Sequence, residues 1–169
     1  MENDKKLIIF YSQTGNTKHI AELIQEQTGG ELVEVEAVTP YKSLYLGGAQ
    51  RVKKERNEGT HPPIKTVTLD EGKYQNVFLG TPNWGNGIAH PIMTLLDQYH
   101  FENATIYPFC THGGGGLAHV ALDIEKRCPE AKIGKSFDIY GDGGAGAKKA
   151  VEAWIHSLDL GGANENNIR

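Results

Sequence analysis

Three loop segments of the chain carry residue types that could together bind a phosphorylated aromatic molecule. The first segment consists of Ser12, Gln13, Thr14, Gly15, Asn16 and Thr17. Hydroxyl groups, a glycine and a following helix can bind a phosphate dianion through O–H groups, backbone N–H groups and the helix dipole. The alternative is that these polar residues only cap the helix. The patterns G-x-x-x-x-G-K-[ST] and G-x-G-x-x-G are both absent, which excludes those two nucleotide-binding loops.

The second segment places a tryptophan among residues that form turns. It consists of Thr81, Pro82, Asn83, Trp84, Gly85 and Asn86. Such a position is a poor one for a core tryptophan, and a planar ligand stacked on the indole would gain ~1 kcal/mol beyond simple burial. The alternative is an indole that folds back onto the edge of a sheet.

The third segment is rich in glycine. It consists of Thr111, His112, Gly113, Gly114 and Gly115, and Gly116 follows. Backbone with so few side chains can lie flat against a ligand and offer N–H groups to its polar edge. The alternative is a flexible linker. His112 could donate a hydrogen bond to the ligand or to a substrate, or it could simply be a polar surface residue.

The elements that carry these loops alternate between short apolar runs and amphipathic stretches. We expect strands at residues 6–12, 32–38, 76–80, 104–110 and 135–140. We expect helices at residues 17–27, 88–99, 117–128 and 147–158. This alternation predicts an α/β fold: a doubly wound, five-stranded parallel sheet with helices on both faces. Right-handed crossovers bring the carboxyl ends of the strands, and therefore the three loops, to one edge.

The region between the second and third strands does not follow this alternation. A helix is expected at residues 48–58, with charges at Arg51, Lys53, Lys54, Glu55 and Arg56. These charges are typical of a solvated helix face; the alternative is a patch that attracts a phosphate group or a partner. Residues 1–160 are expected to form one domain, and residues 161–169 a flexible C-terminal tail.

Composition narrows the class of protein. The chain has 169 residues, 38% of them hydrophobic, and a net charge of −4. This is enough apolar material for one core, and the mild acidity argues against a nucleic-acid-binding protein. The short apolar runs and polar N-terminus predict a cytoplasmic protein without a signal peptide or membrane span. Cys110 and Cys128 lack C-x-x-C spacing and are expected to be reduced, and no histidine spacing indicates a metal site.

Side by side, the three loops would bind a phosphate, a flat ring and the ring's polar edge, as in a mononucleotide such as flavin mononucleotide (FMN). The sequence resembles the flavodoxin family over residues 5–160. The first segment matches the family's phosphate loop, [TS]-x-[TS]-G-[NT]-T, and Trp84-Gly85-Asn86 is similar to its W-G-D ring loop. Residues 110–116 resemble the C-T-H-G-G-x-G loop of a group of bacterial flavodoxin-like proteins.

The resemblance implies FMN as cofactor, bound by the three segments listed above, with no catalytic side chain assigned. It implies that the carbonyl of Gly85 accepts the N5–H of the reduced flavin. The implied function is transfer of electrons between a reductase and an acceptor, which is a redox protein or a small molecule. The alternative is an FMN-dependent NAD(P)H reductase acting on quinones or similar acceptors. The short chain and the lack of a proton-transfer pair favour the carrier; a monomer and a homodimer both remain open.

Three departures from the family pattern bear on this choice. His112 and glycines replace a third-loop tyrosine, which would leave the outer ring face open to a substrate or nicotinamide. Asn86 replaces the acid of W-G-D, and the net charge of −4 is mild for a flavodoxin. Fewer acidic groups near an anionic reduced flavin predict a less negative potential for its second electron. A phosphorylation-controlled receiver domain is disfavoured, because Tyr11-Ser12 and Thr81-Pro82 do not supply its acidic residues.

Overall fold

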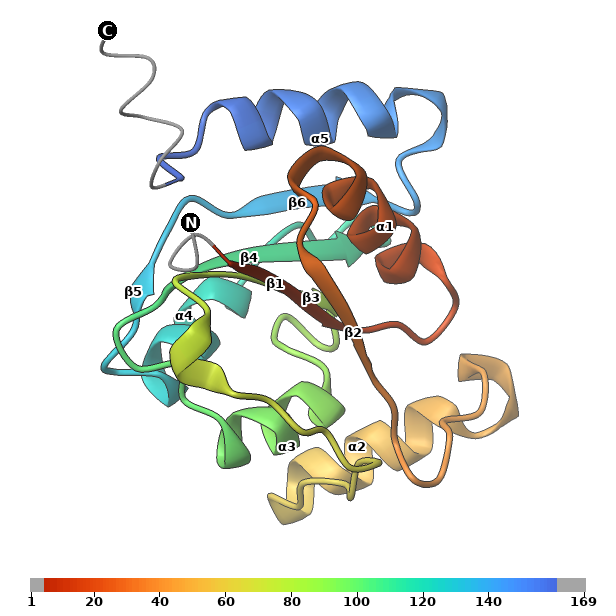
Figure 1. The fold of residues 1–169 in the computed structure, drawn as a ribbon. Helices are drawn as coiled ribbons and strands as arrows, with labels where there is room; N and C mark the ends of the chain where they lie inside the picture. Colours follow the sequence, from red (N-terminus) through yellow and green to blue (C-terminus); the bar gives the residue numbers. More distant parts are fainter. Residues whose placement is uncertain (1–4, 161–169) are drawn as a thin grey trace, which may run out of the picture.

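The apolar run near the start of the chain forms β1 (Lys6–Tyr11), a strand buried on both faces of a parallel sheet. The computed structural model describes residues 5–160 (Figure 1), so the expected tail at 161–169 lies outside the described residues. The other strands are β2 (Glu31–Val35), β3 (Asn76–Pro82), β4 (Thr105–His112), β5 (Lys132–Ile133) and β6 (Phe137–Tyr140).

The strand order is β2-β1-β3-β4-β5, and β6 also pairs with β4. All of these pairings are parallel. The order reverses at β1, because the chain first adds β2 on one side and then crosses to β3 on the other. The loops after β1 and β3 therefore diverge, which leaves a crevice between them at the carboxyl edge. This topology confirms the predicted doubly wound α/β fold.

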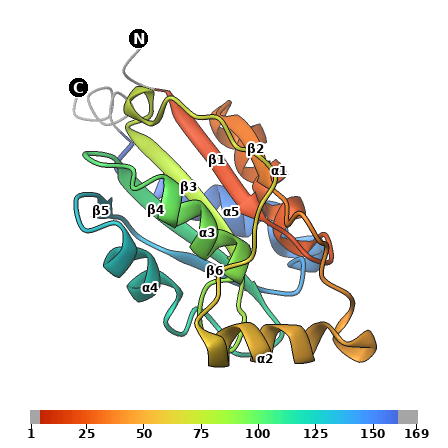
Figure 2. The same ribbon diagram turned by 90° about the horizontal axis from the view of Figure 1, so that it is seen from below.

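Helices cover both faces of the sheet, as the alternation of elements predicts (Figure 2). They are α1 (Asn16–Thr28), α2 (Gly48–Glu58), α3 (His90–Gln98), α4 (Val120–Arg127) and α5 (Ala147–His156). Helices α1 and α5 pack on one face through a core that includes Ile24, Phe78 and Trp154. Helices α3 and α4 pack on the other through a core that includes Leu79 and Leu95. The tight packing of both layers fixes the positions of the loops at the edge.

The fifth strand is broken in two, where the sequence predicts one strand at 135–140. The short β5 pairs with the start of β4 and β6 pairs with its end. Between them, the indole Nε1–H of Trp154 donates to the carbonyl of Lys135 at 3.1 Å. The ring of Tyr107 also occupies the space beside Gly134, where a side chain would overlap it. These contacts take the backbone out of the ladder over a few residues.

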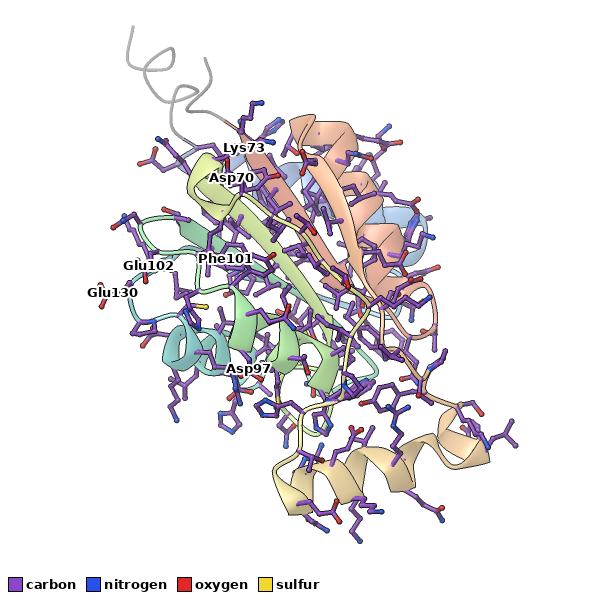
Figure 3. All side chains as sticks on the ribbon, turned by 60° about the horizontal axis from the view of Figure 1, so that its bottom comes forward. Asp70, Lys73, Asp97, Phe101, Glu102 and Glu130 are labelled. Carbon is purple, nitrogen blue, oxygen red and sulfur yellow. The ribbon has the colours of Figure 1, made fainter. Side chains whose placement is uncertain are left out.

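The connection from β2 to β3 carries α2, at the bounds expected from the sequence, and two short 3₁₀ turns, η2 (Leu44–Leu46) and η3 (Glu71–Lys73). Helix α2 lies across the carboxyl ends of the strands rather than on a face of the sheet (Figure 2). The chain returns from it beside α3, where Nδ1 of His61 lies 2.6 Å from Oδ2 of Asp97 (labelled in Figure 3). This contact ties the segment that follows the helix to the body of the protein.

The two cysteines are buried free thiols, as expected. Burial raises the pKa of Cys110 to about 12 and that of Cys128 to about 11, so both stay protonated and unreactive at neutral pH. Among residues 5–160, none of the helices has the length and apolar character that crossing a membrane requires.

Candidate functional site

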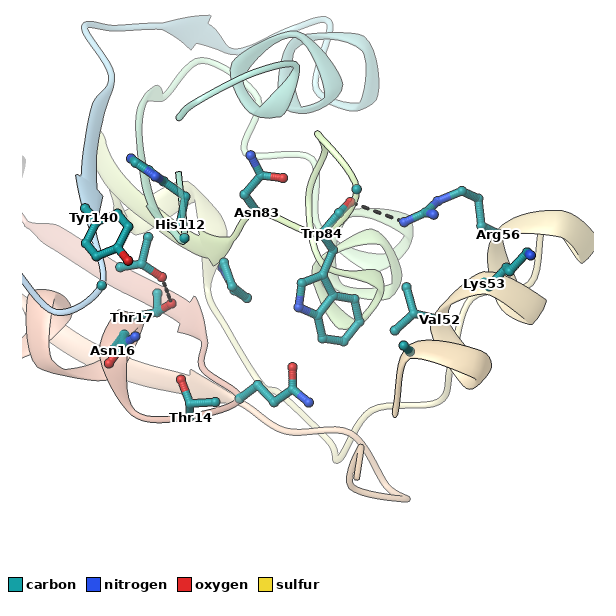
Figure 4. Close-up of a pocket in the computed structure, with 17 residues that line it drawn as sticks. Thr14, Asn16, Thr17, Val52, Lys53, Arg56, Asn83, Trp84, His112 and Tyr140 are labelled. Carbon is teal, nitrogen blue, oxygen red and sulfur yellow. Dashed lines mark hydrogen bonds between the residues drawn. The ribbon is translucent and has the colours of Figure 1, made fainter. Parts of the chain in front are cut away.

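A cavity of about 610 Å³ opens at the carboxyl edge of the sheet (Figure 4). The three loops predicted from the sequence meet around it. Eleven residues of those loops line the cavity: Gln13, Thr14, Asn16, Thr17, Pro82, Asn83, Trp84, Gly85, Thr111, His112 and Gly113. Six further lining residues come from other elements: Ala49, Val52, Lys53, Arg56, Tyr140 and Gly141.

One end of the cavity is the amino terminus of α1. Gly15 has a left-handed φ of 98°, which turns the chain sharply into the helix, and no side chain caps the helix. The hydroxyl of Ser12 instead accepts a hydrogen bond from the N–H of Gly15 at 3.1 Å. The capping alternative is therefore not what the structure contains. The uncapped N–H groups of the first turn can take an anion from the cavity.

Three hydrogen bonds hold the three loops to one another. Oγ1 of Thr17 lies 2.7 Å from Oγ1 of Thr111, in a buried position. Nδ2 of Asn83 donates to the carbonyl of Gly116 at 2.8 Å, and the N–H of Asn83 donates to the carbonyl of Thr111 at 2.9 Å. Because these groups are already paired, the relative positions of the loops are set before any ligand binds.

Trp84 begins a tight turn. Its N–H donates to the carbonyl of Gly87 at 2.9 Å, and its own carbonyl accepts the N–H of Gly87 at 3.2 Å. The two residues between them, Gly85 and Asn86, have φ values of 59° and 76°. Positive φ at both central positions is the geometry of a type I′ turn, which glycine and asparagine adopt at low cost. Because asparagine adopts the positive φ of this turn at low cost, the turn explains its presence at position 86 without reference to a ligand.

The Trp84 indole is half-buried, with part of it on the cavity (Figure 4) and the rest against other rings. Ring centroids of Tyr41, Tyr11 and His90 lie 4.8, 5.5 and 5.5 Å from it, in edge-to-face contacts. Both sequence interpretations thus hold in part, because the indole packs against the sheet edge and still lines the cavity. Fixed in this way, it offers a flat, preorganised surface to a planar ligand.

A carboxylate lies beneath these rings. Glu55 accepts hydrogen bonds from the hydroxyl of Tyr41 at 2.6 Å, Nδ1 of His90 at 2.7 Å and Nε of Arg51 at 3.1 Å. Burial raises the pKa of Glu55, but the hydrogen bonds from Tyr41 and His90 and the charge of Arg51 outweigh it and hold the pKa below its usual value. Burial, and then the hydrogen bond to Glu55, raises the pKa of Tyr41. Glu55 is therefore a charged anchor that fixes α2 to α3.

One face of helix α2 contacts the body of the protein, and another lines the cavity. Arg51 and Glu55 face the protein, and Ala49, Val52, Lys53 and Arg56 line the cavity. Nη2 of Arg56 lies 3.4 Å from the carbonyl oxygen of Trp84 (Figure 4). Among the described residues that line the cavity, the side chains with a full charge are Lys53 and Arg56, and no carboxylate is among them. This end of the cavity therefore favours an anionic ligand.

The third loop is held by its histidine. The N–H of Gly114 donates to Nδ1 of His112 at 3.0 Å, which leaves the proton of the neutral ring on Nε2. Nε2 lies 3.0 Å from Oδ2 of Asp138 and donates to it. Both ring nitrogens are thus engaged within the protein, so the proposed donation from His112 to a ligand would require one of these bonds to break.

Six residues of the predicted site support the loops and do not line the cavity: Ser12, Gly15, Thr81, Asn86, Gly114 and Gly115. The hydroxyl of Thr81, for example, is buried and accepts the N–H of Ala89 at 2.9 Å. The N–H of Asn86 donates to Oδ1 of Asn83 at 2.8 Å.

Sequence reasoning missed the contribution of α2 and of Tyr140 to the cavity. The sequence leaves the charges of Lys53 and Arg56 open between a solvated face and a patch that attracts a phosphate group or a partner. The i,i+3 spacing of Lys53 and Arg56 and the i,i+4 spacing of Val52 and Arg56 place each pair on one side of the helix. Tyr140 is 69% exposed, and its ring centroid lies 6.2 Å from that of His112. It is the last residue of β6, so topology places it at the same edge as the loops that follow the other strands. An aromatic side chain therefore borders the cavity even though the third loop has none.

The fold and this cavity define a class of protein. The family model described as flavodoxin matches residues 5–158, and the chain belongs to that family. No curated protein matches the sequence at a significant level.

Solved structures with the same fold include a candidate flavoprotein from Bacteroides eggerthii. It is 28% identical, with a TM-score of 0.78, and the alignment covers 91% of this chain and 97% of that one. A flavoprotein from Lactobacillus acidophilus, solved in complex with FMN, is 23% identical, with a TM-score of 0.71 over 90% of this chain and 99% of that one. Oxidised flavodoxin 2 from Bacillus cereus is 17% identical, with a TM-score of 0.58 over 90% of this chain and 95% of that one.

Proposed function

We propose that the protein binds FMN in the cavity at the carboxyl edge and carries electrons between a reductase and an acceptor. The observation that carries this proposal is the cavity itself, whose two ends match the two ends of FMN. The open amino terminus of α1, beside Thr14 and Asn16, suits the phosphate. The Trp84 indole and the apolar side chain of Val52 suit the flat ring system.

When bound, the flavin supplies the redox chemistry, taking up electrons together with a proton at N5. The protein's own groups set its binding and environment. Thr14 and the first-turn N–H groups of α1 hold the phosphate, and Trp84 orients the ring. Lys53 and Arg56 favour the added negative charge of the reduced ring. The carbonyl of Gly85 stands on a turn whose glycine can adopt either peptide orientation, which suits acceptance of the N5 proton.

The alternative is an FMN-dependent NAD(P)H reductase. The observation that favours it is the pair of cations on the cavity wall, since a nicotinamide dinucleotide is itself an anion. The carrier remains the better-supported proposal. Among the described residues that line the cavity, His112 has both ring nitrogens engaged by Gly114 and Asp138, so it is not poised for proton transfer to a small substrate.

Two measurements test the proposal in sequence. The first is titration of flavin-free protein with FMN, for which we expect saturable binding at one site per chain with a change in the visible spectrum. Riboflavin, which lacks the phosphate, is the matched control and should bind at least tenfold more weakly. Equal affinity for the two would contradict the phosphate end of the site.

The second measurement separates the carrier from the reductase. The holoprotein is mixed with NADPH and a quinone, with and without a separate flavodoxin reductase. A carrier is reduced only when the reductase is present, whereas steady NADPH oxidation by the protein alone would assign it to the reductase class.

A further inference from the structure

The segment that leads into α2 exposes apolar side chains to an unusual degree. Tyr45 and Leu46, in η2, are 96% and 72% exposed, the two highest values among the exposed large hydrophobic side chains of residues 5–160. The segment that leads into the amino end of α2 stands away from the sheet (Figure 1). Exposed aromatic and aliphatic groups side by side are characteristic of protein-binding surfaces.

The same segment is basic within an acidic protein. Residues 39–56 contain Lys42, Arg51, Lys53, Lys54 and Arg56 and one acidic residue, although the whole chain carries −4. The acidic residue is Glu55, which faces inward and is neutralised by its bonds to Arg51, Tyr41 and His90. The outward charge of the segment is therefore positive.

This basic, apolar surface adjoins the cavity. Lys53 lines the cavity directly, and Nε2 of Gln13, another lining residue, donates to the carbonyl of Lys42 at 3.1 Å. A molecule bound to the segment would therefore lie next to the ligand in the cavity, where electron transfer over a short distance is possible.

We propose that Lys42, Tyr45, Leu46, Lys53 and Lys54, named here the basic arm, form the docking surface for an acidic electron-transfer protein. The proposal rests on the proposed function, because it supposes FMN in the adjacent cavity. Charge complementarity would steer such a partner toward the cavity and raise its association rate.

The extent of the basic arm argues for a protein rather than a small anion. Helix α2 has 11 residues and is therefore ~16 Å long, and η2 extends the surface beyond its amino end. Tyr45 and Leu46 also supply apolar area that a hydrophilic anion would not use.

The experiment measures electron transfer by stopped flow between the FMN-loaded protein and an acidic probe, reduced plant-type [2Fe–2S] ferredoxin. One electron leaves the reduced cluster, which is oxidised, and enters oxidised FMN, which is reduced and loses visible absorbance. We expect a second-order rate that falls as salt is added. The double variant Lys42→Glu/Lys54→Glu, at positions that do not line the cavity, should lower the rate about tenfold at low salt. The difference should narrow as the Debye length shrinks.

The control applies the same charge change elsewhere. Lys5 and Lys132 lie at the amino edge of the sheet, opposite the cavity, and both are exposed. Lys5→Glu/Lys132→Glu should keep the ferredoxin rate within about twofold of wild type. Cytochrome c, a basic acceptor, should show the reverse response and be reduced faster by the basic-arm variant. Tyr45→Ser/Leu46→Ser should slow the ferredoxin reaction and leave its salt dependence unchanged.

Equal ferredoxin rates in the basic-arm and control variants, or a wild-type rate that rises with salt, would overturn the docking proposal. Either result with FMN bound leaves the proposed function intact. If the protein does not bind FMN, the proposed function fails first. Menadione, a neutral quinone, should oxidise the reduced protein at the same rate in all variants. A lower rate in the basic-arm variant alone would show that its cavity is damaged. Its slower reaction with ferredoxin would then overturn the evidence for docking.

Discussion

The guanidinium of Arg56 occupies the space beside Gly85, so a β-carbon at position 85 would overlap it. The contact joins α2 to the turn that carries Trp84, and Nη2 of Arg56 also lies 3.4 Å from the Trp84 carbonyl. Glycine at position 85 is thus favoured by two separate causes: a positive φ of 59°, and the Arg56 guanidinium, which a side chain at this position would have to displace.

These two causes can be separated by a mutant cycle. Gly85→Ala should lower the free energy of unfolding by about 1–2 kcal/mol for the left-handed backbone, and by a further amount for displacement of Arg56. In the Arg56→Ala background only the backbone cost remains, so the same substitution should be less destabilising. Urea unfolding of the four proteins measures the difference. An identical cost in both backgrounds would show that the contact with Arg56 does not constrain this position.

Glu55 should stabilise the protein in a pH-dependent way. Its folded-state pKa lies below the usual 4.5, so its contribution is present above that value and is lost as the pH falls toward the folded-state pKa. We expect Glu55→Gln to cost about 2 kcal/mol at pH 7, because hydrogen bonds from Tyr41 and His90 lose their charged acceptor. The gap to wild type should shrink below pH 4.5.

The control for that variant is Glu58→Gln, the same change at an exposed position on the same helix. It should leave the unfolding free energy within about 0.5 kcal/mol of wild type at both pH values. Thermal or urea unfolding between pH 3.5 and 7 measures both variants. A Glu55→Gln cost that stayed constant over this range would contradict a charged Glu55.

Trp84 should dominate recognition of the ring. Trp84→Ala is expected to raise the Kd for FMN about tenfold, and Trp84→Phe by less, because a smaller ring keeps part of the stacking surface. Trp154→Phe changes the other tryptophan, which α5 carries into the core, and should leave the Kd within about twofold. It also leaves Trp84 as the indole whose emission FMN should quench. Wild-type affinity in Trp84→Ala would remove the indole from the site.

Arg56 should influence the second reduction potential of bound FMN more than Asn86 does, because Arg56 lines the cavity and Asn86 does not. Loss of one positive charge near an anionic ring costs about 1 kcal/mol at moderate effective dielectric, which corresponds to tens of millivolts. Arg56→Gln should therefore make the potential more negative by that amount. Asn86→Asp should shift it in the same direction by less. Spectroelectrochemical titration distinguishes them, and an unchanged potential in Arg56→Gln would refute the electrostatic role of this residue.

The fold was predictable because its signals are local. Apolar runs and helical periodicity located the core elements, and glycine at position 15 and the turn residues around Trp84 located the loops. What the sequence could not supply depends on contacts between distant segments. The break in the fifth strand arises from Trp154 and Tyr107, the first about twenty residues away along the chain.

The candidate site also has parts with local sequence signals and parts that depend on distant contacts. The loops could be assigned because parallel topology gathers them at one edge, whichever residues they carry. The position of α2 across that edge depends on Glu55 meeting Tyr41 and His90, partners 14 and 35 residues away. No periodicity within α2 encodes those contacts, so its charges could be interpreted only as a solvated face or an attracting patch. Tyr140 is the last residue of the strand expected at 135–140, whereas the predicted site consists of loop residues, so Tyr140 is not part of that prediction.

The interrupted fifth strand has a consequence for the behaviour of the protein at high concentration. An open sheet exposes two rows of unpaired backbone groups, onto which strands of neighbouring molecules can add. Here one margin is divided into two short strands, β5 of two residues and β6 of four, and the other, β2, carries Glu31 and Glu34. Within the described residues, neither margin offers a long, flat apolar template, which protects the molecule against fibril-like self-association.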